Sequence, residues 1–120
     1  IAYDPLGMGY MLVKFVRYRD RLVECLQDIR HMSVPTKWLE AEILKHSLDF
    51  DNNPILRWMF GNVVIYQDPN GNVKLDKQRS RNKIDGVVAL VDAIGVYLDS
   101  EASQSNKEIY TTHDLRVLQL

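Results

Sequence analysis

The chain has 120 residues, 46% of them apolar, which suffices for one domain with a hydrophobic core and excludes a disordered chain. A net charge of −1 gives no overall attraction to nucleic acid or to an anionic membrane, so any such contact must be local. The single cysteine excludes an internal disulfide framework and a four-cysteine zinc site.

The N-terminal half predicts a strand end followed by two helices. Ile1 to Asp4 reads as the end of a buried strand, which the following proline terminates because it has no N–H to donate. Apolar residues recur near helical spacing from Gly7 to about Arg19. Arg21 to Gln27 fits either a continuation of that helix or a short strand, of which we favour the strand. A further helix is expected over Ser33 to Ser47, with Pro35 in its first turn.

The C-terminal half predicts a short helix, a β-hairpin and a long helix. Pro54 to Asn62 suits the short helix, because proline is favoured at a helix start. A run of turn-forming residues joins strands expected at Val63–Tyr66 and Val73–Leu75. The run Ile84 to Leu98 is apolar on nearly every side, which predicts a buried helix.

We expect these elements to form one domain over residues 1–99, followed by a polar linker and tail over residues 100–120. The last part of that tail fits a strand as well as an irregular end. The longest apolar run, Gly86 to Leu98, is interrupted by Asp92 and is too short to span a bilayer. No membrane contact is therefore expected.

Asp85 opens the long predicted helix directly behind a basic loop. One interpretation is an acid that interacts favourably with the helix dipole, beside a solvated loop. The other is a carboxylate ligand of Mg²⁺, which prefers hard oxygen ligands, with the loop holding the anionic backbone of a nucleic acid against the ion. The residue pattern alone leaves both open. The loop holds one acid, Asp76, and five cations: Lys74, Lys77, Arg79, Arg81 and Lys83.

Two further acids bear on such a site. Asp4 fits either a turn-initiating residue or an acid at the C-terminal end of a strand, where open α/β sheets place their sites. Asp4 and Asp85, if brought together, could hold one or two metal ions. Asp92 lies two helical turns after Asp85 on the same face. It fits an accessory ligand or a salt-bridge partner of a core-facing cation, and we favour the second because a buried carboxylate needs a partner.

Several short motifs, taken in order, resemble the C-terminal nuclease domain of the large terminase subunit of tailed phages. Each motif is short, but their shared order and spacing make the resemblance fairly specific. The matching segments are Tyr3-Asp4-Pro5, Ser33-Val34-Pro35-Thr36-Lys37, Asn53-Pro54-Ile55-Leu56-Arg57-Trp58-Met59, Asn62-Val63-Val64, Asp68-Pro69-Asn70-Gly71-Asn72 and Lys83-Ile84-Asp85-Gly86-Val87-Val88-Ala89-Leu90.

The resemblance implies an α/β fold, a partial ribonuclease H-like domain with a small mixed sheet packed with helices. It would hold a β-hairpin around residues 63–75 and a long buried C-terminal helix over residues 84–98. It also implies a cluster of acids that binds Mg²⁺ or Mn²⁺ and cuts concatemeric phage DNA. Asp4 would correspond to the family's second acid and Asp85 to its third, both as catalytic metal ligands. The five loop cations would be the DNA contacts.

The resemblance also implies what is missing. The family's first acid and its packaging ATPase domain lie upstream of the matching residues, so we expect an N-terminally truncated domain that binds metal weakly and cuts DNA poorly or not at all. Leu75 stands where a proline is expected. The implied partners are double-stranded DNA, the portal and the small terminase subunit, in the host cell cytoplasm. An exposed sheet edge would favour self-association.

A second function, from a different class, is a non-catalytic DNA-binding or assembly module. In that case the basic loop, residues 74–83, contacts phosphates without any metal chemistry. Such a module would bind DNA with a salt-dependent affinity that does not need Asp85.

Overall fold

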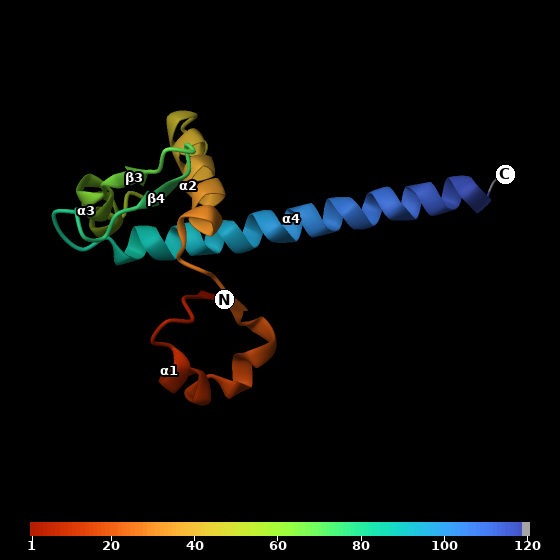
Figure 1. The fold of residues 1–120 in the computed structure, drawn as a ribbon, viewed down its shortest axis with the longest axis horizontal. Coiled ribbons are helices and arrows are strands. Elements are labelled where there is room, and N and C mark those ends of the chain that lie inside the picture. The colour runs from red at the N-terminus through yellow and green to blue at the C-terminus, as the bar shows by residue number, and fades with distance from the viewer. Residues whose placement is uncertain (119–120) are drawn as a thin grey trace.

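The long C-terminal helix α4 (Asp85–Leu118) is the element against which the rest of the protein packs (Figure 1). The computed structural model of the chain describes residues 1–118, and side chains for residues 1–106. Helices α2 and α3 and a hairpin lie on one side of α4, and a small N-terminal unit lies on the other. The remaining elements, in chain order, are β1 (Ala2–Tyr3), α1 (Gly9–Lys14), the 3₁₀ helix η1 (Val16–Arg21), β2 (Val23–Glu24), α2 (Ile29–Leu44), α3 (Pro54–Asn62), β3 (Ile65–Gln67) and β4 (Val73–Leu75).

The strands form two small sheets rather than one. Strands β1 and β2 pair in parallel, with Ala2 opposite Val23. Strands β3 and β4 form the predicted antiparallel hairpin, with Ile65 opposite Leu75. The hairpin is tied to α2, because the hydroxyl oxygen of Ser33 accepts a hydrogen bond of 3.1 Å from the backbone N–H of Val73. The expected mixture of small sheets and helices is thus present, with the two strand pairs lying apart (Figure 1).

The core lies where the first half of α4 meets α2. Val87 and Val91 of α4 are completely enclosed, and Met32 and Leu39 of α2 pack against them. Full burial of an aliphatic side chain stabilises the fold by about 1.5–3 kcal/mol. This contact therefore fixes the first half of α4 relative to α2 and so positions the acids that this half carries.

Helix α2 begins at Ile29, four residues before its predicted start, because Asp28 caps it. One Asp28 carboxylate oxygen accepts hydrogen bonds from the backbone N–H groups of Arg30 and His31, at 2.9 and 3.2 Å. The prediction that Pro35 lies in the first turn is therefore wrong, and Pro35 is inside the helix. The Pro35 ring packs against Gly95 of α4, where an added Cβ would lie 3.7 Å from the ring, an ordinary van der Waals contact.

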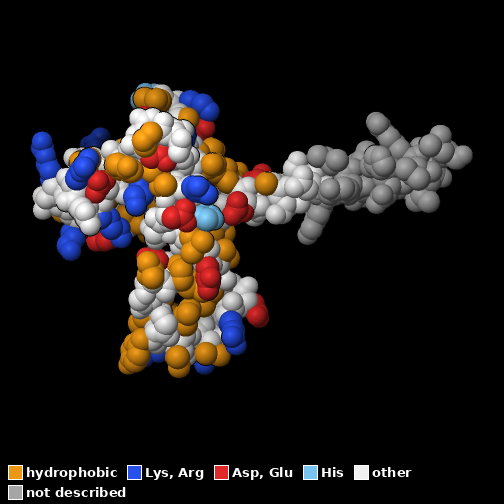
Figure 2. All heavy atoms as spheres, viewed as in Figure 1, with side chains coloured by type: hydrophobic (Ala, Val, Ile, Leu, Met, Phe, Trp, Pro, Cys, Tyr) orange, Lys and Arg blue, Asp and Glu red, His pale blue; other side chains and the backbone are white. Residues whose placement is uncertain are grey.

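The helix predicted from Gly7 to Arg19 is instead split into α1 and η1. Neither α1 nor η1 has a buried residue, so no packing favours one regular helix there. The strand that we favoured within Arg21–Gln27 is present as β2. Many apolar side chains of this N-terminal unit are exposed, as Figure 2 shows, among them Leu6 at 81% and Val13 at 74%.

Helix α4 does not end near Leu98 as predicted but continues to Leu118. The prediction of a polar linker over residues 100–106 is therefore wrong, and this stretch is helical. Beyond Gly95 the helix contains neither glycine nor proline, and alanine, glutamate, glutamine and lysine favour continued helix even where nothing packs against them. Within the described part of the chain, no helix is both long and apolar enough to cross a membrane.

Candidate functional site

A cleft of about 490 Å³ brings the end of β1, the hairpin and α4 together. It lies beside the N-terminal half of α4, on the side where the basic loop leaves β4. Its wall combines one strand-end acid with three cations from the basic loop. The lining residues are Asp4, Gln27, Met32, Tyr66, Lys74, Leu75, Asp76, Lys77, Gln78, Arg79 and Val88.

Asp4 follows β1 directly and is half-buried. Its Oδ1 accepts a hydrogen bond of 2.9 Å from the backbone N–H of Leu6. This turn across Pro5 ends the strand and holds the Asp4 side chain in place at the cleft. The structure therefore puts Asp4 at a strand end, as the sequence predicts. Asp4 both forms the turn that follows the strand and lines the cleft, so the two interpretations of this residue do not exclude each other.

Asp85 is the first residue of α4, and its side chain is 68% exposed. Its Oδ1 lies 3.9 Å from the Nζ of Lys77, which itself lines the cleft. Asp85 is not among the residues that line the cleft with Asp4. The ion pair with Lys77 nevertheless joins Asp85 to a side chain that lines the cleft, and we refer to this position as the cleft rim.

Asp92 is the buried acid of α4, with 9% of its surface exposed. Its Oδ1 accepts a hydrogen bond of 2.7 Å from the Nε2 of Gln27. Burial raises the pKa of Asp92, the Gln27 hydrogen bond lowers it, and the nearby charge of Asp4 raises it further. The partner expected for Asp92 was a core-facing cation. That expectation is wrong, because the neutral amide of Gln27 satisfies the carboxylate.

The basic loop is held in a defined conformation by its own polar residues. Asp76 Oδ1 accepts hydrogen bonds of 3.0 Å from the backbone N–H groups of Gln78 and Arg79. The Ser80 hydroxyl donates to the carbonyl of Asp76 at 2.6 Å and accepts from the backbone N–H of Val64 at 3.3 Å. The loop is thereby anchored to the chain before β3, and its cations project from a fixed backbone.

The cations of this loop divide into two groups. Lys74, Lys77 and Arg79 line the cleft. Arg81 and Lys83 are exposed and lie outside its lining. An anionic backbone bound in the cleft would therefore meet three cations directly, while the other two extend the positive surface beyond it.

Comparison with known proteins decides the family. The family described as "Terminase large subunit, endonuclease domain" matches residues 1–101. The chain belongs to this family. It is a terminase nuclease domain in sequence over most of its length, and the resemblance drawn from its motifs is confirmed.

Individual relatives agree with this assignment. "Protein YmfN" of Escherichia coli (strain K12) is 37% identical over 98 residues, which are 80% of this chain and 22% of that protein. "Terminase, large subunit" of Enterobacteria phage HK97 is 34% identical over 92 residues, which are 77% of this chain and 16% of that protein. The chain spans about a fifth of the length of these curated relatives.

A solved structure confirms the fold class. The crystal structure of the HK97 bacteriophage large terminase matches with a TM-score of 0.66 at 29% identity. The match covers 79% of this chain and 20% of the HK97 chain. The small strand pairs and helices described above are thus the arrangement of the terminase nuclease domain, which has a ribonuclease H-like fold.

The oxygen donors of this terminase domain fit Mg²⁺ or Mn²⁺ in kind, although few are close together. Mg²⁺ usually keeps several waters and binds through one or two carboxylates and substrate phosphates. Asp4 supplies a carboxylate in the cleft and Asp85 supplies another at its rim. Within the residues whose side chains are described, no three His, Cys, Asp or Glu side chains gather around one point. These residues therefore fit an ion that is held weakly, largely through its own waters.

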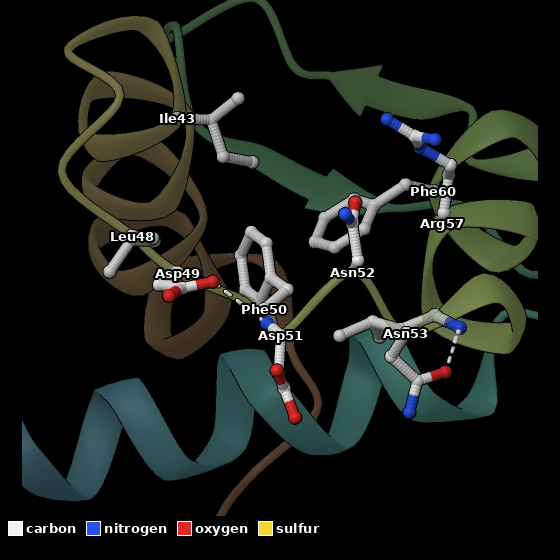
Figure 3. A pocket seen from close by; sticks show the side chains of 10 residues that line it. Ile43, Leu48, Asp49, Phe50, Asp51, Asn52, Asn53, Arg57 and Phe60 are labelled. Atoms are coloured by element: carbon white, nitrogen blue, oxygen red, sulfur yellow. Dashed lines mark hydrogen bonds between the residues drawn. The ribbon is translucent and has the colours of Figure 1, made fainter.

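Figure 3 shows a second cavity, of about 610 Å³, between the end of α2 and the start of α3. Its polar side chains are used in local structure. Asp49 accepts a hydrogen bond of 2.8 Å from the backbone N–H of Asp51, and Asn53 caps α3 by accepting from Ile55 at 3.0 Å. No sequence pattern indicated this cavity, and the structure assigns no chemistry to it.

Gln27 is a polar cleft residue that the sequence did not reveal. It lies in the segment Arg21–Gln27, which carries none of the motifs quoted above, and its partner Asp92 is 65 residues away in the chain. No spacing rule connects two such positions. Only the packing of the segment before α2 against α4 brings them together.

Proposed function

We propose that this chain forms part of the metal-dependent endonuclease domain of a terminase that cuts concatemeric viral DNA during packaging. The observation that supports this most directly is the cleft, where the carboxylate of Asp4 shares a wall with the cations of the basic loop. This arrangement suits the hydrolysis of a phosphodiester, because the acid can bind a metal ion and the cations can bind the phosphates.

Asp4 and Asp85 are the proposed catalytic metal ligands. Bound there, Mg²⁺ or Mn²⁺ would activate a water and stabilise the charge that develops on the phosphate. Asp4 contributes its carboxylate from inside the cleft, and Asp85 contributes from the rim. Asp92 is assigned no ligand role here, because its buried oxygen is already bonded to Gln27.

Lys77 connects the proposed metal ligand Asp85 with the proposed binding of DNA phosphates. It pairs with Asp85 at 3.9 Å, and both side chains are more than half exposed, at 56% and 68%. Exposed ion pairs are worth only about 0–1 kcal/mol. A DNA phosphate entering the cleft can therefore replace Asp85 as the partner of Lys77, which frees the Asp85 carboxylate for an ion.

The proposed substrate is double-stranded DNA, contacted through Lys74, Lys77 and Arg79 in the cleft and through Arg81 and Lys83 beside it. By family, the further partners are the portal and the small terminase subunit, in the host cell cytoplasm. These belong to whole terminases, of which the chain spans about a fifth. We expect the 120 residues by themselves to bind metal weakly and to cut DNA poorly.

The second candidate is a non-catalytic DNA-binding or assembly module that uses the basic loop. The observation in its favour is the ion pair of Asp85 with Lys77, together with the absence of a cluster of three ligands among the described side chains. In this case the loop would bind phosphates while the acids serve only local structure.

Manganese binding separates the two candidates. We would titrate the chain with Mn²⁺ alone and measure free Mn²⁺ by electron paramagnetic resonance, for the parent chain and for Asp4→Asn and Asp85→Asn. The nuclease proposal expects both variants to bind Mn²⁺ several-fold more weakly. Equal binding by all three would contradict it and leave the DNA-binding module. Strong Mn²⁺-dependent nicking of plasmid DNA, abolished by Asp85→Ala, would instead contradict the expectation of a poor nuclease.

A further inference from the structure

The hydrogen bond between Gln27 and Asp92 does more than satisfy a buried acid. Gln27 lines the cleft that holds Asp4, whereas Asp92 lies behind it and is not part of that lining. Asp92 accepts from the amide nitrogen of Gln27 at 2.7 Å. An ionised carboxylate can only accept hydrogen bonds, so the nitrogen of this amide must face Asp92.

That constraint fixes where the other end of the amide points. An amide carries its oxygen and nitrogen on the same planar carbon, so directing the nitrogen to Asp92 directs the oxygen elsewhere. Among the described side chains, no buried polar atom lacks a partner, and Gln27 Oε1 accepts no hydrogen bond from them. The oxygen is therefore open to solvent, and the open space beside Gln27 is the Asp4 cleft.

We propose that Gln27 supplies a neutral oxygen donor to the metal-binding cleft and that Asp92 is the positioning residue that orients it. This inference rests on the proposed nuclease function. Side-chain amide oxygens are ordinary ligands of hard divalent cations, and they also accept hydrogen bonds from the waters that such ions retain. Gln27 thus adds an oxygen beside Asp4 in a site that has few carboxylates.

The role of Asp92 follows from the same geometry. It is buried and follows Val91, which is fully buried where α4 packs on α2, so its carboxylate has a fixed position. Gln27 precedes α2 in an irregular segment and has no regular structure of its own to hold its side chain. The fixed acid therefore orients the flexible amide, as carboxylates behind metal ligands do in many proteins.

The test measures Mn²⁺ binding by the whole chain, with the free ion followed by electron paramagnetic resonance. Gln27→Ala removes the oxygen, and Asp92→Ala releases the amide. Loss of such an interaction typically weakens metal affinity by about 10–100-fold, so both variants are expected to bind Mn²⁺ at least tenfold more weakly. Gln67→Ala, a glutamine of β3 outside the cleft, is the matched control and should leave the affinity unchanged.

A gain-of-affinity variant guards against a merely structural effect. Gln27→Glu places a carboxylate where the amide oxygen faces the cleft, and repulsion by the fixed Asp92 directs this new carboxylate toward the cleft. If Gln27 faces the ion, this variant binds Mn²⁺ more tightly than the parent chain. A Gln27 that only supports the fold would give a less stable protein with no gain in Mn²⁺ affinity, and that result would overturn the inference.

The outcomes for this inference and for the proposed function are separable. Unchanged Mn²⁺ affinity in Gln27→Ala and Gln27→Glu, with weakened binding in Asp4→Asn, would reject the role of Gln27 and keep the nuclease proposal. Unchanged affinity in Asp4→Asn as well would reject both. Circular dichroism of each variant shows whether the fold is retained, so that a loss of binding is assigned to the site.

Discussion

Gln27 and Asp92 are joined by a hydrogen bond of 2.7 Å although 65 residues separate them in the chain. The bond links the segment before α2 to the N-terminal part of α4, which also contacts β1. It satisfies an acid that would otherwise be costly to bury. It also leaves that acid close to a second one, Asp4, whose charge acts on it. The stability of this region should therefore depend on pH.

The expected dependence follows from the direction of the pKa shift. Burial, aided by the charge of Asp4, raises the pKa of Asp92 above its ordinary 3.8, while Gln27 and Lys77 lower it less. Between 3.8 and the raised value, the native state binds more protons than the unfolded state, so this contribution to stability falls as pH rises. Asp92→Asn, which keeps an acceptor for Gln27, should remove that loss.

Denaturant unfolding checks this pH dependence. The free energy of unfolding is measured for the parent chain and for Asp92→Asn between pH 3.5 and neutral pH, and the difference between the two is the readout. The advantage of the variant should appear and grow as pH rises from about 4, close to the ordinary pKa of an aspartate. Asp99→Asn, an exposed acid on the same helix, is the control. A difference that stays constant with pH would contradict the assignment of the raised pKa to Asp92.

Removing cations from the cleft should weaken DNA binding in a salt-dependent way. Lys77→Gln and Arg79→Gln each remove a charge that lines the cleft. Each lost phosphate contact should reduce the slope of log affinity against log salt by about one. Fluorescence anisotropy with duplex DNA at several salt concentrations, in the presence of a chelator, measures this slope.

Two matched variants show whether the cleft or the whole loop contacts the DNA. Arg81→Gln removes an exposed cation of the same loop that does not line the cleft, and Lys45→Gln removes one at the end of α2. The cleft arrangement predicts a smaller effect for Arg81 than for Arg79, and none for Lys45. Equal effects of Arg79→Gln and Arg81→Gln would mean that DNA lies across the loop rather than in the cleft.

Two glycines of α4 should respond differently to alanine. At Gly86 an added Cβ would lie 2.7 Å from the sulfur of Met59, so something must shift, whereas at Gly95 the nearest atom, of Pro35, is 3.7 Å away. Overpacking costs about 1–3 kcal/mol, and alanine favours a helix interior over glycine by about 1 kcal/mol. Gly86→Ala should therefore destabilise the fold, and Gly95→Ala should stabilise it by up to about 1 kcal/mol.

Thermal unfolding of both variants tests this difference. The double variant Gly86→Ala with Met59→Ala provides the control, because removing the sulfur should make the cost of Gly86→Ala smaller. An equal change in melting temperature on Gly86→Ala with and without Met59 would contradict the close approach of α3 to the start of α4.

The exposed apolar surface of the N-terminal unit predicts self-association. Leu6, Val13 and Tyr10 are each at least 74% exposed, and the parallel pair of β1 and β2 is short. Parallel strands are normally covered on both faces, so a partner surface is expected here. Light scattering over a range of concentrations should show a species larger than 13.9 kDa, and Leu6→Ser with Val13→Ser should reduce it. A strictly monomeric chain would count against this prediction.

The elements that local chemistry dictates were predictable from the sequence. Helix α3 follows the prediction residue for residue, because Asn53 caps it and Pro54 occupies its first position. The hairpin follows from the turn after β3, where Asp68 accepts hydrogen bonds from the backbone N–H groups of Asn70 and Asn72 at 2.9 and 2.8 Å. The ordered motifs likewise identified the family before any geometry was available.

The ends of other elements depended on contacts that a sequence pattern does not show. Pro35 signals a helix start, yet α2 begins at Ile29 because the Asp28 cap comes first in the chain. Helix α4 continues past its apolar stretch, since the following residues favour helix without needing a partner. Periodicity marks the buried part of a helix, not its full length.

Sequence patterns were enough to identify the family and to single out Asp4, Asp85 and the basic loop as candidates, because short motifs and charge runs are local properties of the chain. Which of these residues share a cleft could be seen only in the folded protein. Packing of α4 on α2 buries Asp92 and turns it toward Gln27, while Asp85 at the N-terminal end of the same helix stays in solvent beside Lys77. The two acids differ because only one of them lies on a part of the helix that other elements cover. Which part is covered depends on contacts between residues far apart in the chain, such as the 65 residues between Gln27 and Asp92.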